Sequence, residues 1–195
     1  LKAIAENRGI VREASELGLP LVVLVCGADP EQSLESSRAQ ITEALSTLAP
    51  EAAEAGVVLG IEPLHPMYAD TRSAVSTLGQ ANDIAEAVGS SSVQVVVDVY
   101  HLWWDSALAS EIARAGRSNR LAAFHVCDWK VPTSDFLLDR GLMGEGCIPI
   151  PEIRGAVEEA GFNGFIEVEI FSEHYWSIDQ SAYLKQIIEA YLTAV

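Results

Sequence analysis

The alternation of short apolar runs with longer segments of helical spacing constrains the fold of this chain more than any other feature. Five continuous runs of mainly Val, Ile, Leu, Ala and Phe, bounded by turn residues, predict strands that are buried on both faces. These strands are Leu21–Val25, Val57–Ile61, Val93–Val97, Leu121–Val126 and Phe165–Ile170. Strands that alternate with helices are typical of βαβ units and therefore predict a parallel sheet.

The segments between the strands have the periodicity of amphipathic helices. In Ser33–Ala55 the apolar residues fall three, four or seven positions apart, which gives a helix a single apolar stripe. Comparable patterns predict further helices at Leu1–Leu17, Ser73–Val88, Ile150–Ala160 and Gln180–Leu192. Glycines, which are favoured just after a helix, stand shortly before strands at Gly18, Gly56, Gly89 and Gly161.

This order of elements fits two architectures, a doubly wound sheet and a (β/α)₈ barrel. Neither GxGxxG nor GxxxxGK[ST] occurs, so the common nucleotide-binding loops are absent and the barrel is favoured. A complete barrel has eight units and about 250 residues, whereas this chain has five predicted strands in 195 residues. We therefore expect residues 1–195 to form one α/β domain that holds about the last five βα units of a TIM barrel, with three N-terminal units missing. A complete five-stranded open sheet is the alternative.

The charge and the apolar runs exclude several classes of function. The chain has 12 Lys+Arg and 28 Asp+Glu, a formal net charge of −16, so it repels a phosphate backbone and we expect no nucleic-acid binding. The longest apolar run, residues 19–26, is too short for a membrane span, and no secretion signal is recognisable. The three cysteines form no CxxC pair, which favours a reduced, cytoplasmic environment.

Four of the five predicted strands end in an ionisable residue at or directly after the apolar run. These residues are Glu62 in IEPLHP, Asp98 in DVYH, His125 in HVCD and Glu169 in IEVEIF. The C-terminal ends of barrel strands share one rim, so we expect the four side chains to converge. Each residue alone has an ordinary structural explanation, such as helix capping by Asp98. Four of them together at one rim would be costly to bury without a cation, and their mixed oxygen and nitrogen donors suit Mn²⁺, Mg²⁺ or Co²⁺.

Taken together, these motifs resemble the xylose isomerase-like superfamily of TIM barrels, which includes sugar isomerases and epimerases. The resemblance runs from about Leu17 to Val195, the last five units of that fold. IEPLHP is similar to the fifth-strand segment of the family, DVYH to the sixth and HVCD to the seventh. RGLMGEG resembles the family loop R-x-x-P-G-x-G, with Met143 in place of the proline, and VEIF resembles the eighth strand.

The resemblance implies a role for each of these residues. One divalent metal ion, Mn²⁺ in the first place and Mg²⁺, Co²⁺ or Zn²⁺ as alternatives, would be held by Glu62, Asp98, His125 and Glu169. Glu62 and Glu169 would also act as the acid and base that transfer protons. His101 would contact substrate oxygens, and Arg140 would bind a substrate hydroxyl or help to hold Glu169.

Some neighbouring residues remain ambiguous in the sequence. Glu167 and Glu169 face the same side of their strand, and Glu169 is preferred because it lies nearer the C-terminal end. Asp128 and Lys130 in HVCDWK would reach either substrate or solvent. Three tryptophans follow two of the ligand-bearing strands and would either line the pocket or serve in packing: Trp103, Trp104 and Trp129.

The expected activity is that of a metal-dependent isomerase or epimerase acting on a sugar or sugar derivative. A cation that holds a substrate carbonyl oxygen and the neighbouring hydroxyl stabilises the enediolate. A carboxylate can then remove the proton from the hydroxyl-bearing carbon next to the carbonyl. The family also implies a homo-oligomer, and no membrane partner is expected.

Three other functions were weighed. A lyase or dehydratase acting on keto-sugars or keto-inositols would use the same metal site and is the main alternative. An endonuclease IV-like nuclease is disfavoured because it needs D-x-H where this chain has Asp139-Arg140-Gly141, and because the chain is acidic. A non-catalytic barrel subunit is disfavoured because all four ligands are present.

Overall fold

A computed structural model describes residues 2–195, so Leu1, the first residue of the predicted helix Leu1–Leu17, lies outside the described part. A five-stranded sheet forms the centre of the structure, in the order β1-β2-β3-β4-β7. Its strands are β1 (Leu21–Val25), β2 (Val58–Glu62), β3 (Val93–Asp98), β4 (Leu121–Val126) and β7 (Ile166–Val168). A separate antiparallel pair is formed by β5 (Asp128–Trp129) and β6 (Arg140–Gly141).

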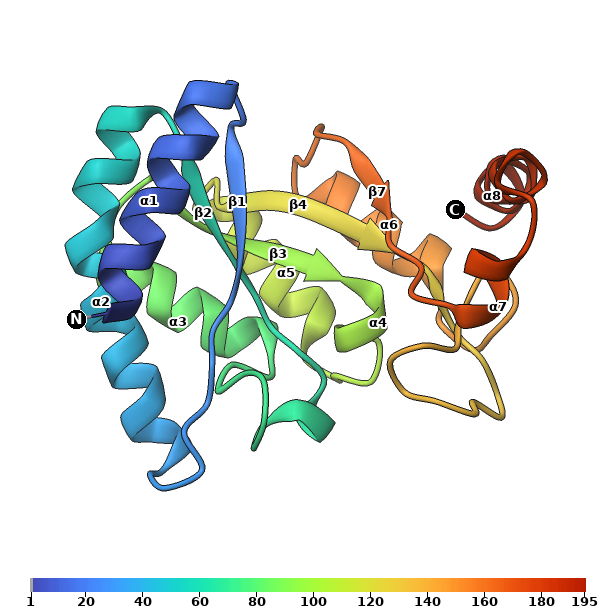
Figure 1. Cartoon of the computed structure of the whole chain (residues 1–195), viewed down its shortest axis with the longest axis horizontal. Coiled ribbons are helices and arrows are strands. Elements are labelled where there is room, and N and C mark those ends of the chain that lie inside the picture. Colours follow the sequence, from blue (N-terminus) through green and yellow to red (C-terminus); the bar gives the residue numbers. More distant parts are fainter. Residues whose placement is uncertain (1) are drawn as a thin grey trace.

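The strand order distinguishes between the two architectures that the sequence allowed. Each strand of the large sheet lies beside the next large-sheet strand of the chain, and all four pairs are parallel (Figure 1). A doubly wound sheet instead reverses its strand order at a switch point. Sequential order is that of a (β/α)₈ barrel, so the predicted partial barrel with five parallel strands is confirmed.

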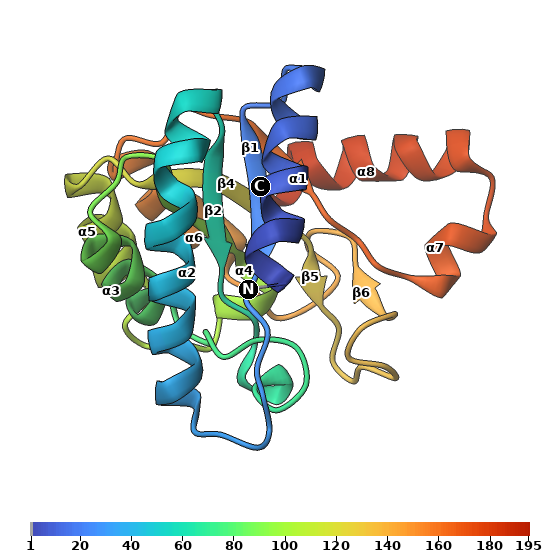
Figure 2. The same ribbon diagram turned by 60° about the vertical axis from the view of Figure 1, so that its left-hand side comes forward.

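Helices alternate with the strands along the chain. They are α1 (Lys2–Leu17), α2 (Leu34–Ala55), η1 (Pro66–Tyr68), α3 (Leu78–Val88), α4 (Val99–Leu102), α5 (Leu108–Arg117), α6 (Ile150–Glu159), α7 (Glu173–Ser177) and α8 (Gln180–Ala194). Among them α1, α2, α3, α5 and α6 pack each against the next, while α8 extends away from α2 and α3 (Figure 2). No helix within residues 2–195 is both long and apolar enough to cross a membrane.

Two predicted elements were too long. The helix predicted at Ser73–Val88 begins only at Leu78, because the hydroxyl of Thr77 caps it by accepting from the N–H of Gln80 at 3.2 Å. The preceding residues form a buried turn in which the Ser73 hydroxyl bonds to Val75, and such local bonds compete with the helix. The strand predicted at Phe165–Ile170 covers only Ile166–Val168, since its pairing with β4 involves three residues.

The connection between β3 and β4 contains a helix that the sequence analysis missed. Helix α5 buries Leu108, Ile112 and Ala115, which are spaced four and three apart. That spacing is the signal of an amphipathic helix and would have predicted the element.

The close contact between α5 and α6 depends on Gly116. A Cβ atom there would lie 2.4 Å from the carbonyl oxygen of Ala160, so we expect Gly116→Ala to destabilise the protein by about 1–3 kcal/mol. Gly155 in α6 is the matched control, because its Cβ would meet nothing within 4 Å and Gly155→Ala should stabilise by about 0.5–1 kcal/mol. Urea unfolding measures both changes, and equal effects would contradict this packing.

Candidate metal centre

Four ionisable side chains converge at the C-terminal ends of the strands. Glu62 and Asp98 are the last residues of β2 and β3, His125 lies one residue before the end of β4, and Glu169 directly follows β7. The parallel register places Asp98 beside His125. One potential ligand atom from each of the four residues lies within 4.8 Å of the others. The structure therefore brings together the four residues that the sequence placed at one rim.

Two buried polar atoms of this cluster have no hydrogen-bond partner within residues 2–195, namely Asp98 Oδ2 and His125 Nε2. The other oxygen of Asp98 accepts from the N–H of Tyr100 at 2.8 Å and so caps α4. The other nitrogen of His125 lies 3.0 Å from Glu62 Oε1. Buried polar atoms are nearly always satisfied in proteins. These two, together with the carboxylate and imidazole donors around them, fit a divalent cation.

The electrostatics of the cluster favour proton retention when no cation is bound. Burial raises the pKa of Asp98 to about 8; the positive charge of Arg140 opposes this shift, and the carboxylates of Glu62 and Glu169 reinforce it. Burial lowers the pKa of His125, but the hydrogen bond to Glu62 and the charge of Asp98 outweigh it and raise the pKa to about 9. A cation would therefore compete with protons for the same side chains.

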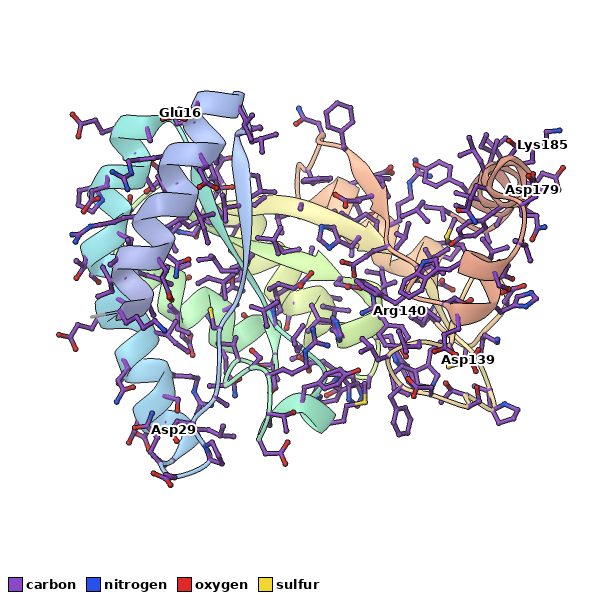
Figure 3. The ribbon with its side chains drawn as sticks, in the orientation of Figure 1. Glu16, Asp29, Asp139, Arg140, Asp179 and Lys185 are labelled. Atoms are coloured by element: carbon purple, nitrogen blue, oxygen red, sulfur yellow. The ribbon has the colours of Figure 1, made fainter. Side chains whose placement is uncertain are left out.

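Arg140, labelled next to Asp139 in Figure 3, lies beside the cluster, since its Nη1 is 3.6 Å from Asp98 Oδ2. Its side chain is only 2% exposed, and Nη1 donates to Glu169 Oε2 at 2.7 Å. The guanidinium carbon lies 4.2 Å from the centre of the Tyr100 ring and 4.9 Å from that of Phe171. The bond to Glu169 corresponds to one of the two roles expected for Arg140.

His101 belongs to the same buried network. Its Nδ1 accepts from the backbone N–H of His65 at 3.2 Å, and its Nε2 lies 3.3 Å from Arg140 Nη2. Burial, and then the positive charge of Arg140, lower the pKa of His101 well below its usual value, so its imidazole is neutral near pH 7. Contact between His101 and substrate stays a prediction.

The ambiguous acidic and basic neighbours lie outside the four-residue cluster. The side chain of Glu167 is 69% exposed, and its Oε2 is 4.0 Å from His125 Nε2. Lys130 forms an ion pair with Asp139. Asp128 is buried and accepts backbone N–H groups.

The tryptophans differ in their surroundings. Trp129 stacks on Tyr100 with 4.8 Å between ring centres, and Trp103 packs beside Trp129 at 5.7 Å. Trp104 is partly exposed and donates from Nε1 to the carbonyl of His101 at 2.8 Å. Trp103 and Trp129 thus pack within one group of aromatic rings, although the buried Nε1 of Trp103 has no hydrogen-bond partner within residues 2–195, whereas Trp104 is 37% exposed.

The sequence analysis assigned no role to Tyr100 and Phe171, the two rings that enclose the Arg140 guanidinium. Both stand in motifs already singled out, Tyr100 in DVYH and Phe171 in VEIF. Arginine stacks well on aromatic faces, so aromatic residues next to candidate ligands were the available signal.

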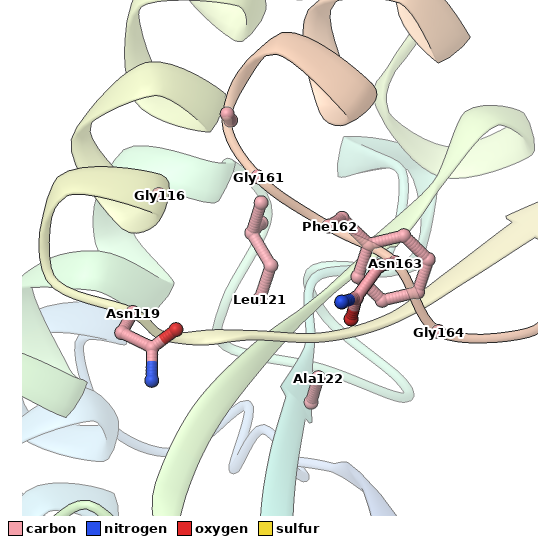
Figure 4. A pocket seen from close by; sticks show the side chains of 9 residues that line it. Gly116, Asn119, Leu121, Ala122, Gly161, Phe162, Asn163 and Gly164 are labelled. Atoms are coloured by element: carbon pink, nitrogen blue, oxygen red, sulfur yellow. The ribbon is translucent and has the colours of Figure 1, made fainter.

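A hollow at the opposite end of the sheet offers no comparable chemistry (Figure 4). It lies between the ends of α5 and α6, near the starts of β4 and β7. Its lining contains no ionisable side chain and consists of Gly116, Asn119, Leu121, Ala122, Ala160, Gly161, Phe162, Asn163 and Gly164. This hollow therefore provides no candidate metal-binding or proton-transferring side chain.

Comparison with known families and sequences gives consistent matches. A family model described as "Xylose isomerase-like TIM barrel" matches residues 1–192. An inosose isomerase of Halalkalibacterium halodurans is 28% identical over 186 residues, which cover 93% of this chain and 64% of that protein. A D-psicose 3-epimerase of Enterocloster bolteae is 28% identical over 138 residues, covering 70% of this chain and 41% of that protein. The chain thus spans less than two thirds of the length of these curated relatives.

Solved structures show the same fold. Protein SMc04130 from Sinorhizobium meliloti 1021 superposes with a TM-score of 0.95 at 47% identity, over 99% of this chain and 71% of that one. The IOLI protein, crystallised with a bound zinc atom, superposes with a TM-score of 0.80 at 24% identity, over 98% of this chain and 68% of that one.

Proposed function

Because this chain belongs to the xylose isomerase-like TIM-barrel family, we propose that it is a divalent-metal-dependent isomerase or epimerase of a sugar or sugar derivative. The observation that carries the proposal is the cluster of Glu62, Asp98, His125 and Glu169, with one ligand atom from each within 4.8 Å of the others. Relatives matched over much of the chain are named inosose isomerase and D-psicose 3-epimerase, which supports this class of reaction.

In this proposal the four side chains of the cluster hold one divalent ion. Three carboxylates and one imidazole suit Mn²⁺, Mg²⁺, Co²⁺ or Zn²⁺. The unpartnered Asp98 Oδ2 and His125 Nε2 support this assignment, and the IOLI protein has been crystallised with zinc. When bound, the ion would polarise a substrate carbonyl and acidify the neighbouring C–H group.

The proton transfers are assigned to Glu62 and Glu169. One carboxylate removes the proton next to the carbonyl, and the other returns a proton to the same carbon in an epimerase. In an isomerase the proton returns to the neighbouring carbon instead. Arg140 orients Glu169 through the 2.7 Å bond and is itself held between two aromatic rings. Neutral His101 would contact the substrate oxygens.

Deuterium exchange provides the direct test of this function. The Mn²⁺-loaded protein is incubated in D₂O with ketohexoses, keto-inositols and 3-keto-glycosides, and the products are followed by NMR. We expect deuterium at the carbon next to the carbonyl, together with an epimer or isomer. A dehydrated product would instead assign the lyase, and an absence of exchange with bound Mn²⁺ across these compounds would contradict the proposal.

Metal binding is expected to strengthen as the pH rises from about 6 to about 8. In the metal-free protein the pKa of Asp98 is raised to about 8 and that of His125 to about 9, so both groups hold protons near pH 7. Both must lose them to bind an ion, and about one to two protons should be released per ion. Calorimetric Mn²⁺ titrations in buffers of different ionisation enthalpy count these protons. A Mn²⁺ affinity that is constant over this range would rule out such competition.

A further inference from the structure

We propose that Asp128 is a positioning residue, which fixes the segment Arg140–Ile148 and thereby sets where the Arg140 guanidinium meets Glu169. Its consequence for turnover rests on the proposed function. The structural part of the inference stands without it.

Asp128 is 1% exposed, and its carboxylate accepts four backbone N–H groups. Oδ2 accepts from Gly144 at 3.0 Å and Gly146 at 2.8 Å, whereas Oδ1 accepts from Ile148 at 3.0 Å and Trp129 at 2.8 Å. Hydrogen bonds to a charged acceptor are the stronger kind, and they offset the cost of burying the charge. Three of these bonds join Asp128 to the segment Arg140–Ile148, so the carboxylate holds this segment against β5; we call this contact the Asp128 clamp. Both oxygens of the buried carboxylate are engaged by backbone N–H groups, so Asp128 does not contact substrate.

The loop is shaped to fit this carboxylate. A Cβ atom at Gly146 would lie 2.1 Å from the carbonyl oxygen of Trp129 and 2.5 Å from Asp128 Oδ1. Gly144 has a φ of +92°, a conformation that other residues rarely adopt. Both glycines of RGLMGEG that donate to Asp128 thus stand where a side chain would disturb the contact.

Asp128 and Trp129 also hold the beginning of the segment Arg140–Ile148. Strands β5 and β6 pair Asp128 with Gly141 and Trp129 with Arg140. The N–H of Cys147 donates to the carbonyl of Trp129 at 3.0 Å, and the N–H of Arg140 donates to the carbonyl of Phe171 at 3.0 Å. The backbone of Arg140 is therefore fixed between the Asp128 clamp and the chain that follows Glu169.

The position of the Arg140 backbone determines where its side chain contacts the metal-site cluster. Nη1 lies 2.7 Å from Glu169 Oε2 and 3.6 Å from Asp98 Oδ2. A displacement of about 1 Å is enough to reduce the rate of an oriented reaction by about 100-fold. Loss of the clamp should therefore affect the Glu169 carboxylate although Asp128 does not touch it.

The test compares Asp128→Asn with Asp139→Asn in the 195-residue protein. Asn keeps the size of Asp128 but points an NH₂ donor at backbone N–H donors. Asp139 is a matched control, because it neighbours Arg140 but its carboxylate bonds to Lys130 and Ser134. The readout is hydrogen exchange of the buried Arg140 Nε–H with solvent, followed by ¹⁵N NMR. We expect this exchange to be at least about tenfold faster in Asp128→Asn and to keep the wild-type rate in Asp139→Asn.

The second readout is the turnover of whichever substrate the deuterium assay identifies. We expect kcat to fall about 10- to 100-fold in Asp128→Asn with KM little changed, whereas a merely structural role would lower thermal stability alone. Unaltered Arg140 exchange in Asp128→Asn overturns the inference. Faster exchange in a protein whose wild type turns over no substrate supports the clamp and rejects the proposed function.

A measurement on the wild type covers the case in which Asp128→Asn does not fold. The clamp requires the amides of Gly144, Gly146 and Ile148 to be protected from hydrogen exchange, unlike those of an unbonded loop. Protection of all three supports the inference, and free exchange overturns it.

Discussion

Glu169→Gln is expected to lower kcat by about 10³-fold or more, because the amide keeps the size of the side chain but cannot accept a proton. The amide oxygen can still receive the bond from Arg140 Nη1, which lies 2.7 Å from Glu169 Oε2, so the surrounding network should survive. Steady-state kinetics at saturating Mn²⁺ separate this chemical defect from weakened metal binding.

Glu167→Gln is the matched control for this experiment. Glu167 lies two residues earlier, and its side chain is 69% exposed compared with 29% for Glu169. We expect its kcat to stay within about twofold of the wild type, as is usual for exposed side chains outside a site. An active Glu169→Gln beside an inactive Glu167→Gln would mean that the wrong carboxylate has been assigned.

Asp98→Asn is expected to weaken Mn²⁺ binding by at least about 100-fold, since it removes a carboxylate from the centre of the cluster. The fold should be preserved, because Asn caps a helix as well as Asp does and can still accept from the Tyr100 N–H. Calorimetry with Mn²⁺ alone measures this loss and requires no substrate.

The same variant should leave the metal-free protein at least as stable as the wild type at pH 7. Burial raises the pKa of Asp98 to about 8, so the folded protein binds this proton more tightly than the unfolded chain does. Its stability therefore falls as pH rises from about 4 towards 8, and Asn removes this cost. Asp105→Asn is the control, because Asp105 also accepts a nearby backbone N–H, that of Ala107, outside the cluster. Equal Mn²⁺ affinity in the two variants would contradict the four-residue site.

Strands β1 and β4 have the predicted bounds, because turn residues delimit their continuous apolar runs. The predicted burial on both faces is wrong for β1: none of its residues is buried, and Val23 and Val25 are 38% and 45% exposed, because β1 is an edge strand of the sheet in residues 2–195. The helix predicted from Ser73 failed at its start because Thr77 and the buried turn before it compete for the backbone. Strand β7 is shorter than its apolar run, and Phe165, predicted to be inside it, is 95% exposed.

The convergence of Glu62, Asp98, His125 and Glu169 was predictable because parallel strands end on the same side of a sheet. The aromatic enclosure of Arg140 had only a partial signal: Tyr100 and Phe171 each stand two residues after a candidate ligand, but that both rings meet the same guanidinium depends on the tertiary structure. The roles of the four residues as ligands, and of two of them in proton transfer, stay predictions.

By itself the sequence determined the alternation of strands and helices and the residues at the strand ends, because hydrophobic periodicity is a local property of the chain. Only the tertiary structure decided the sequential strand order, the bond between Arg140 and Glu169, and the use of Asp128 as a clamp. Arg140 and Glu169 are 29 residues apart, and Asp128 and Gly146 are 18 apart. Contacts over such separations depend on how complete elements pack together, which no local pattern records.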